Sequence, residues 1–397
     1  STHRREHRFA AMRRRQFSAS ILASSVFKRM YAQEQPQVRS AAIVTPIQTV
    51  SKQAHLYHGW PTVARRSSGE LVLVWSGGRE AHVCPFGRVE CMISRDEGKS
   101  WSWPRVLMDS DLDDRDAGVV ETSQGTLLVT TFTSLAYEAV LARARRKPSD
   151  DWPAARLARW EAVQKRLSPE DRKALLGCWM LRSTDGGVSW STPYRVPINS
   201  PHGPIAVSDR RVLYAAKDLY GPDGAIGVCE SSDDGLTWRW LAKIPARPGD
   251  QVRDYHELHM VETSPGRLLS HIRNHNTENR NETLQSESGD GGKTWSVPRA
   301  IGVWGLPSHL LRLRDGRLLM TYGYRRAPFG NQARVSDDDG KTWSEPVALS
   351  ADGASGDLGY PSTVELADAS LLTVWYERLR EAPEAVLRQV HWRLESI

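Results

Sequence analysis

The sequence predicts an all-β fold, a six-bladed β-propeller of four-stranded antiparallel blades with a helical insertion in blade 2. Three observations support this prediction. A short phrase ending in tryptophan recurs five times, a strand–turn–strand pattern recurs six times at intervals of roughly 50 residues, and one long helical segment interrupts the second copy. The 397 residues have room for two average domains or one large β domain, and the repeats favour one.

The recurring phrase has the pattern S-x-D-x-G-x-[ST]-W, known as the Asp-box. In it the aspartate accepts hydrogen bonds from nearby backbone N–H groups, the glycine supplies a positive φ, and the tryptophan packs as an apolar plug between sheets. The five copies are SRDEGKSW from Ser94, STDGGVSW from Ser183, SSDDGLTW from Ser231, SGDGGKTW from Ser288 and SDDDGKTW from Ser336. We expect these aspartates to be structural and not catalytic.

The strand–turn–strand segments are rich in Leu and Val, often with Gly at the turn. They are HGWPTVARRSSGELVLVWSGG, DRDAGVVETSQGTLLVTTFTS, PHGPIAVSDRRVLYAAKD, HELHMVETSPGRLLSHIRNH, LPSHLLRLRDGRLLMTYGYRR and LGYPSTVELADASLLTVWYE. A third strand usually follows and enters an Asp-box turn. Four-stranded units at this period are typical of propeller blades, and six hairpins predict six blades.

The segment 134–177 has helical periodicity and interrupts blade 2. Ser168, Pro169 and Glu170 form a helix start, with an N-cap serine, a proline at the first position and an acidic first turn. Such an insertion can act as a rim or lid over a pocket, or it can be a solvent-exposed segment without a role in binding. The sequence favours neither.

The charge is concentrated at the start of the chain. Residues 1–40 contain nine Lys or Arg and two acidic residues, whereas the whole chain carries a net charge of +6. The high pI therefore belongs to this leader, which argues against nucleic acid as a partner. Met12-Arg13-Arg14-Arg15-Gln16-Phe17 and the weakly apolar SASILASSVF resemble a twin-arginine signal, which implies bacterial export to the periplasm or outside the cell. The alternative is a disordered basic tail.

The apolar run of the leader is too short to span a membrane, so we expect no membrane span. Residues 41–397 would then form the propeller, and we expect a monomer. The cysteines Cys84, Cys91, Cys178 and Cys229 lack CxxC spacing and histidine partners at metal-ligand distance, so we expect no metal there. We also expect no cofactor. We expect buried thiols, with a Cys84–Cys91 bridge as the alternative in an oxidising compartment.

The first positions of the six hairpins, where the inner strands of a propeller converge on the axis, are too polar for a packed core. They are His58, Trp60, Arg115, Asp116, His202, Glu257, His259, Ser308, His309, Tyr360 and Ser362. The second strands end on Arg79, Glu80, Lys217, Arg273, Arg325 and Glu377. Polar groups that converge in a concavity predict a binding site, and several arginines there suggest a ligand that carries a carboxylate.

Over residues 50–380 the sequence resembles the sialidase (neuraminidase) superfamily. HELHMVETSPGRLLSHIR is similar to the family segment in which a glutamate, here Glu257, precedes an arginine of a carboxylate-binding triad, here Arg273. GYPSTVELADASLLTVWYE is similar to the segment with the nucleophilic tyrosine, here Tyr360, which ends on the glutamate that steadies a triad arginine, here Glu377. GYRRAPFGNQARVS offers Arg325, or second to it Arg326, for a further triad position.

The resemblance implies a tyrosine nucleophile, because an anionic one would be repelled by the carboxylate on the anomeric carbon of a sialic acid. Tyrosine has a reference pKa near 10, so it needs a base, and Glu257 would accept its proton.

Two departures from the family pattern concern the clamp and the proton donor. Family members usually begin blade 1 with Arg-Ile-Pro, and this chain has Gly59-Trp60-Pro61 there, so Arg79 or Arg115 would have to replace the missing arginine. The stretch GGREAHVCPFGRV lacks the expected acid/base aspartate. His82 or Glu80 would take that role, or Asp114 or Asp116 would reach it; we prefer His82, because imidazole donates a proton near neutral pH.

The sequence therefore predicts a retaining exo-glycosidase of sialidase type, with a glycan that ends in a sialic acid or a related sugar acid as its substrate. His58, His202, His259 and His309 would join Arg79, Arg115, Arg273, Arg325 and Glu377 around that substrate. Two alternatives remain. One is a uronic-acid-directed hydrolase or a polysaccharide lyase on the same scaffold. The other is a glycan-binding propeller without activity.

His256 and His259 are close enough in the sequence to suggest a pair of metal ligands. Because His256 and His259 point to opposite faces of a strand, we expect no metal site there.

Overall fold

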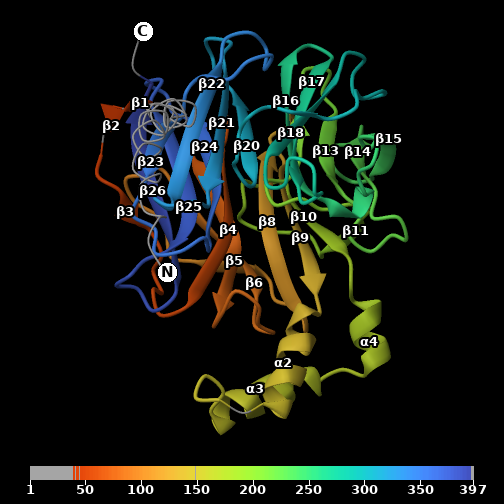
Figure 1. Cartoon of the computed structure of the whole chain (residues 1–397), viewed down its shortest axis with the longest axis vertical. Coiled ribbons are helices and arrows are strands. Elements are labelled where there is room, and N and C mark those ends of the chain that lie inside the picture. Colours follow the sequence, from red (N-terminus) through yellow and green to blue (C-terminus); the bar gives the residue numbers. More distant parts are fainter. Residues whose placement is uncertain (1–38, 41, 44, 148, 395–397) are drawn as a thin grey trace, which may run out of the picture. The chain divides into compact units, whose positions relative to one another are not determined.

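The structure is a computed structural model that describes residues 39, 40, 42, 43, 45–147 and 149–394. The predicted export leader over residues 1–40 falls almost entirely outside the described residues and stays a prediction. From Arg39 onward the chain forms one compact unit of six antiparallel sheets, which confirms the predicted six-bladed propeller (Figure 1).

The first four blades each consist of four consecutive strands. Blade 1 comprises β4 (Tyr57–Arg65), β5 (Leu71–Arg79), β6 (Arg88–Ser94) and β7 (Arg105–Met108). Blade 2 comprises β8 (Asp113–Glu121), β9 (Leu127–Ser134), β10 (Cys178–Ser183) and β11 (Tyr194–Val196). Blade 3 comprises β12 (Ile205–Ala206), β13 (Val212–Lys217), β14 (Ile226–Ser231) and β15 (Arg239–Lys243). Blade 4 comprises β16 (Tyr255–Ser264), β17 (Arg267–Asn274), β18 (Thr283–Ser288) and β19 (Arg299–Ala300), and a short 3-10 helix, η1 (Val252–Asp254), precedes it.

The last two blades are completed by the start of the described chain. Blade 5 comprises β20 (Ser308–Arg312), β21 (Leu318–Tyr324), β22 (Gly330–Ser336) and β23 (Val347–Ser350), and β1 (Arg39–Ser40) pairs with β23 in parallel. Blade 6 comprises β24 (Leu358–Glu365), β25 (Leu371–Arg378) and β26 (Ala385–Arg393). The short strands β2 (Ala42–Ile43) and β3 (Gln48–Thr49) pair with β26 in antiparallel fashion. The ring is therefore closed by backbone pairing between segments from the two ends of the chain.

The Asp-box turns have the expected hydrogen bonds. In the first copy Asp96 accepts from the backbone N–H of Ser100 at 2.9 Å and from the Ser94 hydroxyl at 2.8 Å, and Gly98, with φ +84°, donates to the same hydroxyl. The other four copies repeat these bonds. The Asp-box aspartates therefore stabilise the turns, as expected.

The Asp-box tryptophans pack between blades, and Trp295 gives a direct test of this role. Its indole is 8% exposed and lies in a cluster with Leu213 of blade 3 and Leu268 of blade 4. We expect Trp295→Ala to lower the free energy of unfolding by about 3 kcal/mol or more in guanidinium titration, because it leaves a cavity at that contact. The control is Trp103→Ala, whose side chain is 74% exposed and should matter little. Equal effects of the two changes would contradict the plug role.

The insertion lies between β9 and β10 and forms three helices, α2 (Ala136–Arg146), α3 (Ala154–Gln164) and α4 (Pro169–Ala174), which project beyond the strands of blade 2 in Figure 1. Ser168 caps α4 by accepting from the backbone N–H of Asp171 at 3.0 Å. Tyr137, Leu141 and Trp160 pack around Cys84 in the loop after β5. The helical insertion is confirmed, and it is anchored to the 80–87 loop.

The four cysteines are unpaired and buried. Cys84 packs against the insertion, whereas Cys91 lies in the core between blades 1 and 2, so the alternative of a Cys84–Cys91 bridge is wrong. None of the described helices is both long and apolar enough to cross a membrane.

Candidate active site

Four inner strands are irregular near their first residues. The strand register shifts after Gly59 in β4, after Arg115 in β8, after Tyr255 in β16 and after Gly359 in β24. A bulge bends the strand and redirects a side chain, and bulges are frequent beside active sites.

Three of these bulges contain a non-glycine residue with positive φ: Trp60 at 57°, Asp116 at 45° and Tyr360 at 52°. This conformation is unfavourable for large side chains and concentrates at functional sites. The three bulges therefore mark one end of the axis as the candidate site.

Tyr360, Glu257 and Arg273 form a hydrogen-bonded group at this end. The Tyr360 hydroxyl donates to Glu257 Oε1 at 2.7 Å, and Arg273 Nη1 donates to both Glu257 oxygens, at 2.8 and 3.1 Å, and to the Tyr360 hydroxyl at 3.2 Å. Tyr360 comes from blade 6, and the other two come from the paired strands β16 and β17 of blade 4. The propeller thus joins a phenol, a carboxylate and a guanidinium that are far apart in the sequence.

The pKa values of Tyr360 and Glu257 are shifted in opposite directions. Burial and the charge of Glu257 raise the pKa of Tyr360 well above its usual value. For Glu257, burial acts to raise the pKa, but the charge of Arg273 and the hydrogen bond from Tyr360 outweigh it and lower the pKa to about 2. Without a ligand, the proton therefore stays on the phenol.

Asp116 is a further titratable group at this end of the axis. Burial raises its pKa to about 7, although the charges of Arg115 and Arg273 act to lower it. Its charge also raises the pKa of Tyr360, so the two groups are coupled electrostatically. Within the described part of the chain the Asp116 carboxyl group forms no hydrogen bond or ion pair. The residue is 7% exposed. An unengaged carboxyl group with a pKa near neutrality is suited to proton transfer.

A cavity of about 180 Å³ adjoins the group and is basic. Its lining residues are Arg273, Asn281, Trp304, Leu306, Gly323, Arg325 and Arg326. Arg325 is held by two hydrogen bonds from Nε and Nη2 to the carbonyl of Leu358 and lies over the Tyr360 ring, and Arg326 lies over the half-exposed Trp304 indole. Three guanidinium groups without a lining carboxylate favour an anionic ligand.

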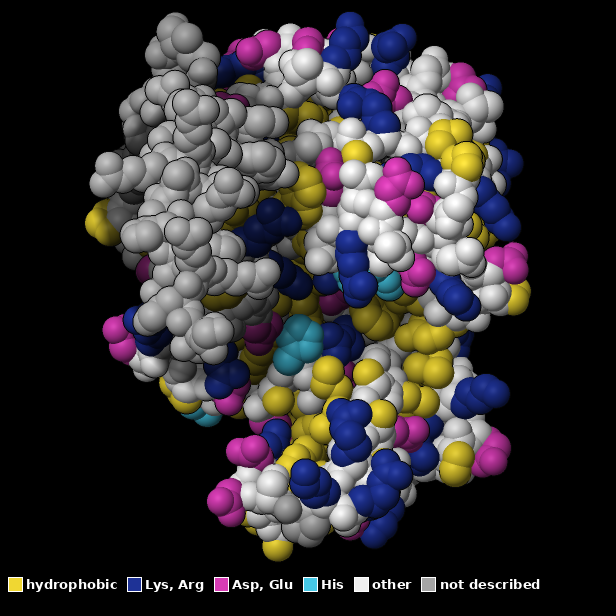
Figure 2. Space-filling view, in the orientation of Figure 1, with side chains coloured by type: hydrophobic (Ala, Val, Ile, Leu, Met, Phe, Trp, Pro, Cys, Tyr) yellow, Lys and Arg dark blue, Asp and Glu magenta, His cyan; other side chains and the backbone are white. Residues whose placement is uncertain are grey.

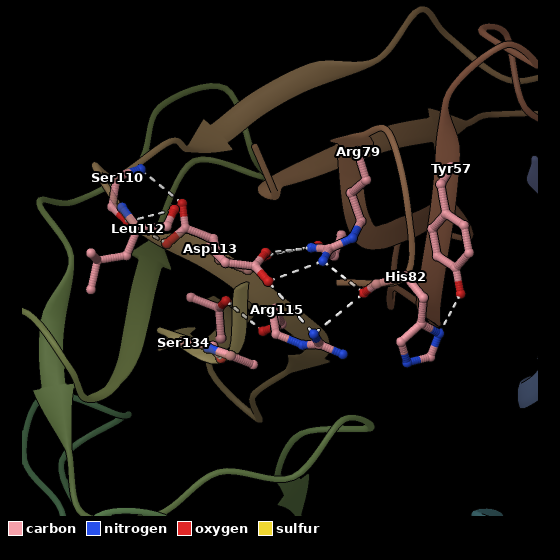
Figure 3. A network of polar contacts seen from close by, with 12 residues as sticks. Tyr57, Arg79, His82, Ser110, Leu112, Asp113, Arg115 and Ser134 are labelled. Atoms are coloured by element: carbon pink, nitrogen blue, oxygen red, sulfur yellow. Dashed lines mark hydrogen bonds and ion pairs between the residues drawn. The ribbon is translucent and has the colours of Figure 1, made fainter. Parts of the chain in front are cut away.

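Arg79 and Arg115 both lie near Asp113 and the backbone of His82 (Figure 3), and both guanidinium groups lie over the Trp60 ring. Arg79 is fully buried and forms a bidentate ion pair with Asp113, at 2.6 and 3.1 Å. Its Nη2 also donates to the carbonyl of His82, as does Arg115 Nη1. The guanidinium of Arg115 lies 4.3 Å from the Trp60 ring centroid. Arg79 is committed to structure, and of the two only Arg115 keeps some exposure toward solvent.

The position of the missing blade-1 arginine is occupied by aromatic side chains. A Cβ atom on Gly59 would lie 3.1 Å from the Tyr57 ring, and the buried Trp60 ring contacts the rings of Tyr360 and Tyr376. No guanidinium can enter there without displacing an aromatic ring.

Glu377 does not reach this group. It is fully buried, accepts from Arg388 Nη1 at 2.5 Å and from the Trp375 indole at 3.0 Å, and Arg388 also pairs with Asp352. The arginine that Glu377 steadies is therefore on β26, within its own blade.

The four proton-donor candidates differ in their contacts. Glu80 accepts from Arg159 and from the Trp160 indole of the insertion, and Asp114 is fully buried and accepts from Ser110. The His82 side chain is 47% exposed, and its Nδ1 lies 2.8 Å from the Tyr57 hydroxyl and 3.0 Å from Asp357. Of the four, only Asp116 has no hydrogen-bond or ion-pair partner for its carboxyl group among the described residues, and its charge acts on the pKa of Tyr360.

The remaining predicted histidines form no hydrogen bond with Tyr360, Glu257 or Arg273 among the described residues, although the His202 ring centroid lies 6.3 Å from that of Tyr360. His58 hydrogen-bonds to the carbonyl of Leu56 and packs near Trp75. His202, His259 and His309 cluster on the axis and line a second cavity farther along it.

Sequence reasoning missed Tyr57, Asp357, Trp304 and His275. Asp357 accepts from the hydroxyls of Tyr57 and Tyr376, and His275 accepts from Arg273 Nε at 3.0 Å. Asp357 lies three residues before Tyr360, and that short spacing was the available signal. Trp304 has no comparable signal, because its loop is irregular.

Lys, Arg and His side chains surround a hollow in the face shown in Figure 2, above the helical insertion. The insertion thus borders this face, as its packing on the 80–87 loop requires.

Comparisons with known proteins agree with this architecture. A curated xyloglucanase from Paenibacillus sp. is 28% identical over 170 residues, which are 38% of this chain and 16% of that protein, so only a small part of its length is matched. Among solved structures, a protein of unknown function from Dyadobacter fermentans has a TM-score of 0.70 at 22% identity, covering 90% of this chain and 100% of that one.

Two sialidases are similar in fold. The Hadza microbial sialidase Hz136 has a TM-score of 0.61 at 17% identity, with 85% of this chain and 66% of that chain covered. The NanB sialidase of Streptococcus pneumoniae, in a mutant structure, has a TM-score of 0.61 at 16% identity, with 89% and 71% covered. The family model of the BNR repeat-like domain matches residues 152–373. The chain therefore belongs to the family of BNR repeat-like domains.

Proposed function

We propose that the protein is a retaining exo-glycosidase that removes a terminal sialic acid or a related sugar acid from a glycan. The observation that carries this proposal is the 2.7 Å hydrogen bond from Tyr360 to Glu257, with Arg273 bonded to both. A phenol that can pass its proton to a partly buried carboxylate, next to a basic cavity, suits attack on an anomeric carbon that bears a carboxylate.

In the first step the Tyr360 oxygen bonds to the anomeric carbon, and its proton goes to Glu257. Asp116 donates a proton to the departing glycosidic oxygen, which leaves as an alcohol. In the second step water attacks the same carbon and gives its proton to Asp116, the bond to Tyr360 breaks, and the phenol regains its proton from Glu257. The products are the free sugar acid and the shortened glycan.

Substrate binding also activates the base. Arg273 lowers the pKa of Glu257, and a substrate carboxylate bound by Arg273 and Arg325 would offset part of that positive charge. The pKa of Glu257 then rises, and the glutamate becomes a better acceptor for the Tyr360 proton. The nucleophile is thereby activated when an anionic sugar is present.

Asp116 is the proton donor in this proposal, in preference to His82. The pKa of Asp116, about 7 through burial, lets it donate a proton and later accept one near neutral pH. His82 is committed to Asp357 and the Tyr57 hydroxyl.

The substrate class is tested with matched aryl glycosides. We expect turnover of an aryl sialoside or aryl glucuronide and none of the aryl glucoside, which lacks the carboxylate. Arg273→Lys should lower kcat/KM on the acidic substrate by about a hundredfold, because lysine cannot form the paired contacts of a guanidinium. The matched control is Arg267→Lys at the exposed start of the same strand. Equal turnover of the acidic and neutral glycosides would contradict the carboxylate requirement.

The second candidate is a uronic-acid lyase on the same scaffold. It is favoured by the aromatic side chains at the blade-1 arginine position and by the Tyr57–His82 hydrogen bond of 2.8 Å, a pair that could act as acid and base in an elimination. A lyase would release an unsaturated product that absorbs in the ultraviolet, and loss of that signal in His82→Gln would support it.

A further inference from the structure

The opposite end of the propeller axis contains a second cavity. The inner strands β4, β8 and β24 begin near the Tyr360 group and end on Arg65, Glu121 and Glu365. A cavity of about 440 Å³ is lined by these strand ends, by β12, by the end of β20 and by His259 in the middle of β16. Ligand pockets commonly measure about 300–1,000 Å³, so this cavity can admit a small molecule.

Three histidines form the inner end of this cavity. The ring centroid of His202 lies 5.4 Å from that of His259, 5.1 Å from that of His309 and 6.3 Å from that of Tyr360. All three histidines line the cavity. They therefore stand between it and the Tyr360 group, and the two sites share none of the residues argued to bind ligand.

The hydrogen bonds assign tautomers to two of these rings. The Thr62 hydroxyl donates to the carbonyl of Pro201 at 3.1 Å, so the His202 Nδ1 that lies 3.4 Å from Thr62 Oγ1 carries the proton and donates. His202 Nε2 is then a buried acceptor without a partner. His259 Nδ1 accepts from the backbone N–H of Leu310 at 2.9 Å, so its Nε2 carries a proton.

His309 adds another free nitrogen, because its Nδ1 is buried without a hydrogen-bond partner. Burial lowers the pKa of His202 to about 3 and those of His259 and His309 well below their usual value. The rings are neutral at pH 7 and offer hydrogen-bond donors and acceptors to hydroxyl groups. Buried polar atoms without partners are uncommon and call for a ligand or water.

The rim of the cavity has excess positive charge. Glu121 is engaged by Arg66 and the backbone N–H of Ser67. Glu365 is engaged by the backbone N–H and the guanidinium of Arg314. Among the described residues no carboxylate pairs with Arg65 or Arg312, and the Arg65 Nε is buried without a partner.

We propose that this cavity is a second binding site for a small polyhydroxylated carboxylate, whose carboxylate is bound by Arg65 and Arg312 and whose hydroxyl groups bond to His202 and His309. Guanidinium groups match carboxylates in bidentate geometry, and neutral imidazoles both donate to and accept from hydroxyls. The proposal is independent of the reaction at Tyr360.

Isothermal titration with D-glucuronate and with N-acetylneuraminate tests the site, with glucose and inorganic phosphate as comparison ligands. We expect Arg65→Ala/Arg312→Ala to remove one binding event per chain or weaken it at least about tenfold, because two charge-assisted contacts are lost. Arg273→Ala should leave this event unchanged and affect only binding at the Tyr360 end. The matched control is Arg317→Ala, whose partner is Asp315 at the blade-5 turn.

A crystal soaked in the sugar acid that binds should show it in this cavity, and His309→Gln should weaken that binding while the protein stays folded by circular dichroism. Binding that is unchanged in the double arginine variant would overturn the proposal. So would equal affinity for glucose, which would remove the need for a carboxylate, or for phosphate, which would remove the need for the hydroxyl groups. Absence of binding by both sugar acids would also overturn it.

Discussion

Tyr360→Phe should lower kcat/KM on an acidic aryl glycoside by at least about a thousandfold, because it removes the oxygen that bonds to the anomeric carbon in the proposed mechanism and leaves only binding and proton transfer. The ring stays, so the packing against Trp60 and Tyr376 is preserved. Glu257 keeps both hydrogen bonds from Arg273, so the free energy of unfolding should change by no more than about 2 kcal/mol.

The matched control for this change is Tyr376→Phe. Tyr376 is also buried, its ring centroid lies 5.8 Å from that of Tyr360, and its hydroxyl donates to Asp357 at 3.1 Å. We expect it to lose less than about tenfold in kcat/KM, because it loses one hydrogen bond beside the site. Full activity in Tyr360→Phe, or equal losses in the two variants, would contradict the nucleophile assignment.

Asp116→Asn should have the second largest effect, and this effect should depend on the leaving group. With a poor alcohol leaving group we expect kcat to fall about 10²–10⁴-fold, the usual contribution of a positioned proton donor. With a nitrophenol, which leaves without a proton, the first step should be nearly unaffected. Asparagine tolerates the positive φ of this position, so the backbone can keep its conformation.

The pH profile gives a second readout for Asp116. Burial raises the pKa of this carboxyl to about 7, so the acid form that donates the proton is lost as the pH rises through 7, and kcat/KM of the wild type should fall there. In Asp116→Asn that alkaline limb should disappear.

Two further variants separate Asp116 from its competitors. Asp114 also has a pKa raised to about 7 by burial, but Ser110 occupies its carboxyl group, so Asp114→Asn should retain the limb. His82→Gln should retain it as well. A limb that vanishes in His82→Gln and survives in Asp116→Asn would assign the proton donor to His82.

The ionisation of Asp116 should also make the stability of the protein fall as the pH rises. Because the pKa of Asp116 is higher in the folded than in the unfolded protein, the folded state holds this proton more tightly. The stabilisation this provides is present below the unfolded pKa near 3.9 and is lost as the pH rises through about 7. Asp116→Asn should therefore unfold at higher denaturant than the wild type at pH 8, and the difference should shrink toward pH 5.

The architecture was predictable because it is encoded by local patterns. The Asp-box residues contact one another within a few positions, as Ser94, Asp96 and Ser100 do, and the hairpins pair with their immediate neighbours. The closure of blade 6 by β2 and β3 could not be predicted, because two strands of two residues each have no readable periodicity.

The site was predictable only in part. The resemblance directed attention to Tyr360, Glu257 and Arg273, which the structure brings together. It did not reveal the partners of charged residues, because these partners come from distant segments. Asp113 neutralises Arg79 and Arg388 occupies Glu377, so two residues expected to contact substrate are committed to structure.

The position of the histidines along the axis was the other unpredictable feature. The pattern of inner strands indicates which residues approach the axis, but it does not indicate how far along the axis each side chain lies. His202, His259 and His309 lie deeper than Tyr360 and face a second cavity, and the bulges that set these levels involve register shifts that the sequence does not display.

Trapping of the covalent intermediate tests the role of Tyr360 most directly. The protein is incubated with 2,3-difluorosialic acid, or with the fluorinated glycosyl fluoride of glucuronic acid if the glucuronide is the substrate, and is then digested and analysed by mass spectrometry. We predict one added sugar acid per chain, on the peptide that contains Tyr360, and no addition in Tyr360→Phe. An addition on any other residue, or turnover of the substrate without any addition, would contradict a tyrosine nucleophile in this protein.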